Sequence, residues 1–220
     1  MSREEIEKIC VKYDIYDYTI NEDGSIDVDN NVDLHPTNKF SELPLNFNIV
    51  TGRFDCGMNK LTTLKGCPKE VGLYFSCKEN YLTSLEYGPT KVVGEYVCDM
   101  NRLTNLIGSP DSSNYDFSCK YNQLTSLEGC PTIASGDFDC RHNKIDNLEY
   151  FPKEINNFYC DYNPIGSIFE GTGNVDFLIA LRTYKVIKDG QVNLKRLKYV
   201  MSLFNEPINL DKIKKHYKIV

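Results

Sequence analysis

The sequence predicts an α/β solenoid, and a regular repeat carries this prediction. A cysteine recurs at intervals of 20 or 21 residues over most of the chain. Each of these cysteines follows an aromatic residue by two positions and precedes an asparagine by three. The six cysteines are Cys56, Cys77, Cys98, Cys119, Cys140 and Cys160. A period in the twenties is typical of solenoids, in which each repeat forms one coil and the stacked coils share a core.

The pattern within one repeat indicates how a coil is built. In the segment FSCKYNQLTSL, Phe117 and Cys119 are two positions apart, so both side chains point to one face of a short strand. Asn122 then turns the chain, and its amide can bond backbone groups of neighbouring coils. Leu124 and Leu127 pack the return path onto the same interior. We therefore expect a parallel sheet with strands about 4.8 Å apart on the concave face.

The repeats divide the chain into three parts. Residues 41–168 form the repeats, 1–40 an N-terminal cap and 169–220 a helical, basic C-terminal cap. An open stack of strands exposes its ends, which such caps cover. Ser2 and the apolar spacing behind it predict a helix over 2–13, and Asp23–Gly24 predicts the turn of a hairpin. The pattern predicts further helices over 174–187 and 193–204, and a short one over 209–217.

The cysteines are expected to be buried free thiols. Free cysteine packs as a small hydrophobe, and adjacent coils would hold the Cβ atoms about 4.8 Å apart, beyond ordinary disulfide geometry. The alternatives are disulfides or zinc, but no C-x-x-C occurs and the three histidines are scattered. An EF-hand loop around Gly24 would begin at Thr19 and end at Asn30, which lack the required carboxylates. We expect no metal, no cofactor and a reducing compartment.

Composition and charge narrow the class of protein. The chain has 220 residues, 41% hydrophobic and 25% charged, and its acidic start is unlike a signal peptide. No stretch approaches the roughly 18 apolar residues of a membrane helix, so we expect no membrane partner and a cytoplasmic protein. The net charge is −6, yet residues 174–220 hold ten Lys/Arg and four Asp/Glu. An acidic body with a basic end suggests two surfaces for different partners, or two ordinary solvated faces.

The segment FSCKYNQLTSL resembles the leucine-rich repeat, with Phe117 and Cys119 at the two strand leucine positions. Its short unit and LTSL turn are similar to the compact bacterial class, which implies an extended, turn-rich convex side. The segment YTINEDGSIDVDNNVDL, followed by LPLNF, resembles proteins of large tailed bacteriophages. That resemblance implies a viral origin and the host bacterial cytoplasm, and it carries over no catalytic residue.

Two departures from the leucine-rich repeat concern the entry to each strand. Val50, Val71 and Val92 sit one residue earlier than the family's first apolar position. The stretch SPDSSNYD at 109–116 lacks the valine altogether, so that coil is expected to be the loosest.

Functional residues are expected at the exposed positions that flank the aromatic residue and the cysteine. Methionine and aromatic side chains beside arginine are typical of protein-binding patches. No serine–histidine–acid set, glycine-rich phosphate loop or enclosed carboxylate pair appears, so we predict no enzymatic activity. The predicted partner-binding residues are Tyr74, Asp99, Met100, Tyr121, Asp139, Arg141, His142, Tyr159 and Tyr162.

The sequence leaves more than one function open. The first is a phage-encoded, monomeric module that binds a host protein, for counter-defence or host takeover. The alternative is a nucleic-acid-linked or DNA-mimicking protein, which would use the acidic repeat face or the basic C-terminal cap. An anion site on that cap would comprise Lys195, Arg196 and Lys198. A structural virion component is a third and weaker hypothesis.

Overall fold

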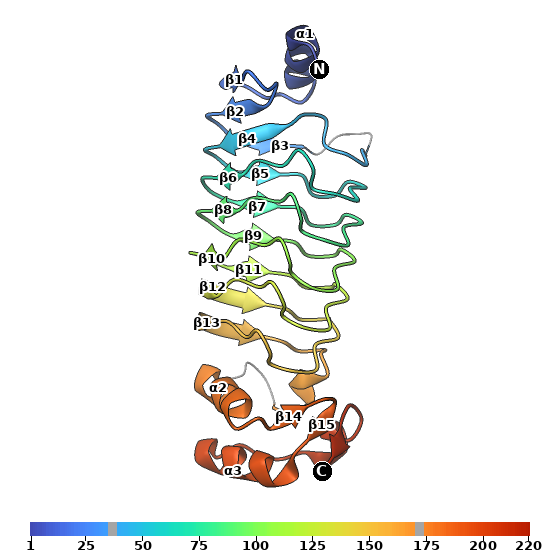
Figure 1. The fold of residues 1–220 in the computed structure, drawn as a ribbon, viewed down its shortest axis with the longest axis vertical. Helices are drawn as coiled ribbons and strands as arrows, with labels where there is room; N and C mark the ends of the chain where they lie inside the picture. Colours follow the sequence, from blue (N-terminus) through green and yellow to red (C-terminus); the bar gives the residue numbers. More distant parts are fainter. Residues whose placement is uncertain (35–38, 170–173) are drawn as a thin grey trace.

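The computed structural model describes residues 1–34, 39–169 and 174–220, and it shows a parallel-strand β-solenoid with few helices (Figure 1). The coils stack along the long axis of an elongated molecule, with the N-terminus at one end and the C-terminus at the other. The predicted solenoid is confirmed. The register repeats the sequence period, because Phe75 pairs with Phe54 on one side and with Tyr96 on the other.

Most coils contribute two short strands, and these form two sheets. The larger sheet carries the aromatic residues of the repeat. Its strands are β3 (Val32–Asp33), β5 (Phe54–Asp55), β7 (Phe75–Ser76), β9 (Tyr96–Val97), β11 (Phe117–Ser118), β12 (Ile133–Asp139) and β13 (Glu154–Tyr159), with β10 (Ser112–Ser113) beside the first part of β12. The smaller sheet consists of β1 (Tyr18–Ile20), β2 (Ile26–Val28), β4 (Phe47–Val50), β6 (Glu70–Val71) and β8 (Lys91–Val92).

The early valine of each repeat explains the second sheet. Val50, Val71 and Val92 are aligned in β4, β6 and β8, and all three are buried. A tight corner then leads into the larger sheet. At Gly72 a Cβ atom would lie 2.0 Å from the carbonyl oxygen of Thr51, so only glycine lets the coils approach this closely. Ser113 replaces the valine in the next coil, and within the described residues β10 pairs with β12 but not with β8.

The interior holds three columns that run along the stack. The six repeat cysteines are free and at most 1% exposed. The aromatic rings stack from coil to coil, with Tyr96 and Phe117 at 5.1 Å between centroids. Each ladder asparagine joins two coils: Asn101 Nδ2 donates to the carbonyl oxygens of Cys77 at 3.0 Å and Cys98 at 3.2 Å. This confirms the predicted asparagine ladder, which satisfies buried backbone groups where strand pairing stops.

The N-terminal segment contains one helix and one hairpin. Helix α1 (Arg3–Lys12) begins after Ser2, whose side chain accepts from the Glu5 backbone while the Glu5 carboxylate accepts from Ser2 N. This capping box satisfies two otherwise unpaired helical donors. The helix buries Ile6 and Cys10 and lies at the N-terminal end of the stack (Figure 1). Strands β1 and β2 form the predicted antiparallel hairpin.

The C-terminal segment departs in part from the prediction. After the 3₁₀ turn η1 (Ile165–Ser167) come α2 (Val175–Thr183), α3 (Leu194–Phe204) and α4 (Leu210–Ile213). The predicted helix over 174–187 is too long, because Lys185 adopts a left-handed φ of 47°. A small sheet of β14 (Ile187–Lys188), β15 (Gln191–Val192) and β16 (Lys218–Ile219) was not predicted. Its turn passes through Asp189 and Gly190, both at positive φ.

Candidate binding surface on the strand face

The outward positions of the larger sheet, together with the turn that follows each of its strands, form one surface, which we name the strand face. It extends from Tyr74 to Tyr162 and carries all nine predicted binding residues. Seven of the nine side chains form two neighbouring groups: a charged network with Asp99, Asp139, Arg141 and Tyr159, and an aromatic stack with Tyr121, His142 and Tyr162. Among the described residues, the side chains of Tyr74 and Met100 contact neither group. Met100 is 48% exposed and occupies the position equivalent to Tyr121 in the preceding coil.

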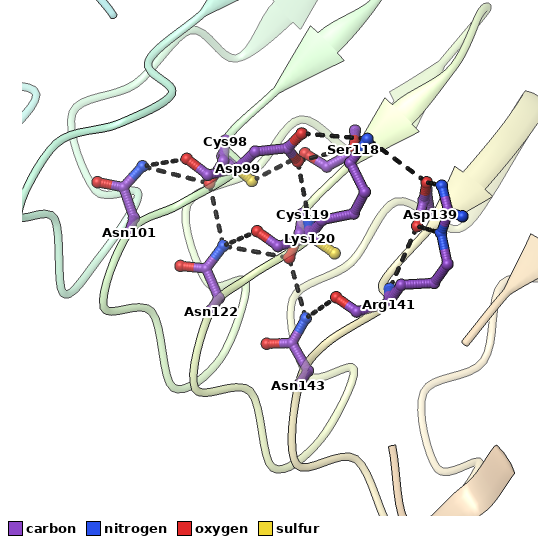
Figure 2. A network of polar contacts seen from close by, with 10 residues as sticks. All are labelled: Cys98, Asp99, Asn101, Ser118, Cys119, Lys120, Asn122, Asp139, Arg141 and Asn143. Atoms are coloured by element: carbon purple, nitrogen blue, oxygen red, sulfur yellow. Dashed lines mark hydrogen bonds and ion pairs between the residues drawn. The ribbon is translucent and has the colours of Figure 1, made fainter. Parts of the chain in front are cut away.

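The charged network joins three successive coils (Figure 2). Lys120 Nζ lies 3.5 Å from Asp99 Oδ2 and 3.6 Å from Asp139 Oδ2, so it bridges the coil before and the coil after its own. Arg141 binds Asp139 with two nitrogens, Nε to Oδ1 at 3.0 Å and Nη2 to Oδ2 at 2.6 Å. Bidentate pairing fixes the guanidinium plane, so the network presents its charges in a set orientation.

Asp99 differs from the prediction because it is buried rather than exposed. Only 9% of it reaches the surface, and its Oδ1 accepts from Ser118 Oγ at 2.7 Å and from Lys120 N at 2.9 Å. Burial raises the pKa of Asp99, and these hydrogen bonds and the Lys120 charge offset the rise only in part. Asp99 therefore orders its neighbours and presents little surface to a partner. Ser76 and Val97, also expected to be outward and exposed, are buried as well.

A shallow hollow of about 350 Å³ is lined by Lys120, Asp139 and Arg141 of the network and by further acidic residues. Glu95 and Asp116 line it, and burial together with the charges of Asp116 and Asp99 raises the pKa of Glu95. On the far side Tyr159 Oη donates to Asp137 Oδ2 at 3.3 Å. The repeat places Glu95, Asp116 and Asp137 at equivalent positions of successive coils, but only the structure shows that they line one hollow.

The aromatic stack consists of Tyr121, His142 and Tyr162. The imidazole lies between the two phenol rings, with centroids 4.1 Å from each and interplanar angles of 10°. Tyr121 is 47% and Tyr162 is 74% exposed. The three residues come from successive coils, and the equal spacing of the coils brings their rings into contact.

The backbone under the stack is left-handed, with φ of 55°, 58° and 61° at Tyr121, His142 and Tyr162. Glycine and asparagine adopt this conformation most easily, so bulky side chains are an unusual choice there. The conformation is held by the asparagine ladder and by backbone bonds between coils, such as Tyr121 N to the Arg141 carbonyl oxygen at 3.1 Å. Large side chains kept at a strained position suggest a role for the side chains themselves.

The residues missed by the sequence prediction are Lys120 and Ser118, which hold the charged network together. The sequence signal for Lys120 was its place directly after a repeat cysteine, one coil after Asp99 and one coil before Arg141. The predicted anion set on α3 is exposed, and Arg196 Nη1 donates to the Lys185 carbonyl oxygen. It lies on the C-terminal segment, apart from the strand face (Figure 1).

Comparison with known proteins gives no relative: no family model, curated protein or solved structure matches the chain. Across residues 1–34, 39–169 and 174–220, no group of three or more His, Cys, Asp or Glu side chains is placed to hold a metal ion. None of the helices in these ranges has the length and apolar character needed to cross a bilayer.

Proposed function

We propose that the chain is a protein-binding module of the leucine-rich-repeat type, which holds a partner protein against its strand face. The observation that carries the proposal is the exposed Tyr121–His142–Tyr162 stack beside the Arg141–Asp139 pair. Tyrosine and arginine are enriched among the residues that dominate interface energetics, because the rigid tyrosine ring buries a large area at a low entropy loss and the arginine fork makes bidentate hydrogen bonds.

The rigidity of the face supports the proposal. Each ring of the stack is held by its neighbours, and the backbone beneath is fixed by hydrogen bonds between coils. Arg141 is already oriented by two bonds to Asp139 and lies above the Tyr159 ring at 5.6 Å. A surface that is ordered before binding loses little entropy on association, which favours affinity.

The proposed origin of the partner rests on the resemblance of the N-terminal segment. The likeness of the segment YTINEDGSIDVDNNVDL, with LPLNF and the repeats behind it, to proteins of large tailed bacteriophages leads us to propose that the module is phage-encoded and binds a host protein in the bacterial cytoplasm. Counter-defence and takeover of host machinery are both compatible with such a partner. A monomer is the form we propose to be active, since one strand face offers one binding surface.

The test compares two double variants in an affinity purification from bacterial lysate. Tyr121→Ala with Tyr162→Ala removes both outer rings of the stack. Tyr87→Ala with Tyr150→Ala is the matched control, because these tyrosines are also exposed, by 68% and 54%, and also have positive φ, yet lie outside the strand face.

The expected result is one partner that the wild type and the control retain and the stack variant loses. The purified pair should then show at least a tenfold increase in Kd for the stack variant, about 1.4 kcal/mol. Equal retention by both variants would place binding elsewhere and overturn the proposal.

The alternative function is DNA mimicry, and one observation favours it. Glu95, Asp116 and Asp137 follow one another on successive coils and line the same hollow, which makes a row of negative charge. A mimic would bind a DNA-binding protein, and duplex DNA would compete for that partner with a strong dependence on salt. Failure of DNA to compete would leave the general protein-binding module.

A further inference from the structure

A second cavity lies where the last coil meets the C-terminal segment. Its volume is about 470 Å³, within the range of small-molecule sites. The last coils contribute Arg141 and Tyr162 to its lining, and the C-terminal segment contributes Lys212 and His216. Residues more than 40 positions apart in the sequence therefore line one cavity, and the repeat pattern gives no sign of this.

The charges around this cavity favour an anion. Within the described part of the chain, Lys212 and His216 make no ion pair, and Lys212 is half-buried. Arg141 uses Nε and Nη2 to bind Asp139, and a guanidinium has five N–H donors, so further donors remain. Asp161 is the only carboxylate among the residues that line the cavity. Arg141 is already paired with Asp139, so Lys212 is the permanent cation of this lining that has no ion pair among the described residues, and the His216 imidazole lines the cavity with it.

One face of the Tyr162 ring is available for stacking. His142 covers the other face, at 4.1 Å between centroids. Tyr162 lines the cavity and is 74% exposed, and within the described residues no ring other than His142 stacks on it. A planar ring placed there would extend the aromatic stack by one member, as bases do on aromatic platforms.

A buried hydroxyl gives an independent sign of a missing partner. Ser167 lines the same cavity and is 4% exposed, yet its Oγ has no hydrogen-bond partner within the described residues. Buried hydroxyls are nearly always paired with protein or with a bound molecule. The Oγ itself is buried, so an oxyanion in the cavity would supply its acceptor only after rotation of the Ser167 side chain.

We propose that this cavity binds a nucleotide, with the phosphate between Lys212, Arg141 and His216 and the base stacked on Tyr162. The shared chemistry is a planar heteroaromatic ring that carries a phosphate monoester. Its source is either a free mononucleotide or the phosphorylated end of a single-stranded nucleic acid. The site adjoins the strand face but does not depend on a protein partner.

The test measures binding of AMP, adenosine and inorganic phosphate to the full chain by calorimetry and ligand-observed NMR. AMP should bind more tightly than either fragment, because only AMP engages both halves of the site. Tyr162→Ala should weaken AMP binding about tenfold. Lys212→Gln should weaken AMP binding at least fivefold and leave adenosine unchanged. Lys195→Gln, a matched charge loss on α3 outside the cavity, should change neither.

A 5′-phosphorylated oligoadenylate distinguishes the two sources. Tighter binding than AMP, with the same sensitivity to Lys212→Gln, would identify the end of a nucleic acid, whereas equal or weaker binding would identify a free nucleotide. No binding of AMP or of the oligonucleotide, or AMP binding that Lys212→Gln leaves unchanged, would overturn the proposal. Lys212→Gln leaves the aromatic stack intact, so this test can fail without contradicting the proposed protein-binding function.

Discussion

Replacing Asn101 by alanine would remove one step of the asparagine ladder and measure what it contributes to stability. The side chain, 8% exposed, makes three donor contacts to carbonyl oxygens and accepts from Leu82 N at 3.0 Å. Each of the three carbonyl oxygens keeps another donor: Asn80 serves Cys77, Asn122 serves Cys98, and the Glu79 amide serves Asp99.

The loss therefore falls on the Leu82 N–H, which Asn101→Ala leaves buried without a partner. An unsatisfied buried donor costs about 1–3 kcal/mol, and the small cavity adds to it. We expect the free energy of unfolding to fall by roughly 2–3 kcal/mol. Asn101→Asp keeps an acceptor for Leu82 but sets a carboxylate against three carbonyl oxygens, so its loss should be larger.

Urea unfolding followed by circular dichroism measures these changes, with Thr104→Ala as an exposed control expected within about 0.5 kcal/mol of the wild type. A loss below about 0.5 kcal/mol for Asn101→Ala would refute the view that the ladder stabilises the stack. Full stability in Asn101→Asp would show that the amide matters only as an acceptor.

Three further predictions concern buried groups. Tyr96→Phe removes a buried hydroxyl that has no partner among the described residues, so it should be neutral or stabilise the protein by about 1 kcal/mol. Phe117→Tyr adds a hydroxyl at a fully buried position and should destabilise the protein. Calorimetric Tm values test both expectations. Asp99→Asn should stabilise the protein at pH 7, because burial raises the pKa of Asp99 in the folded state and the ionised carboxylate is therefore destabilising there. The difference in unfolding free energy between variant and wild type should vanish below about pH 4, where Asp99 is protonated in both states. Urea midpoints at both pH values test this. Native alkylation at pH 7.5 should leave the six repeat cysteines unmodified and modify Cys130 only slowly, since burial raises the pKa of Cys130 to about 12. Rapid labelling of the repeat cysteines, detected by mass spectrometry, would contradict their inward placement.

Much of the fold could be predicted because it is periodic. The 21-residue spacing places every Phe-x-Cys pair and every ladder asparagine in an equivalent position, and one coil then determines the next. The second sheet was harder to predict, since its strands are two to four residues long and show only a displaced valine. The small C-terminal sheet left even less signal, because its strands have only two residues each.

The sequence by itself determined which residues occur in each outward column, including Tyr121, His142 and Tyr162, and that cysteine and asparagine point inward. Only the tertiary structure decided that the three rings stack, that Lys120 bridges two carboxylates and that Asp99 is buried. The reason is that a repeat pattern gives the position of each Cα but not the side-chain conformations that neighbouring coils impose on one another. The cavity at Lys212 could not be predicted from the sequence, because it depends on how a non-repeating segment packs against the last coil.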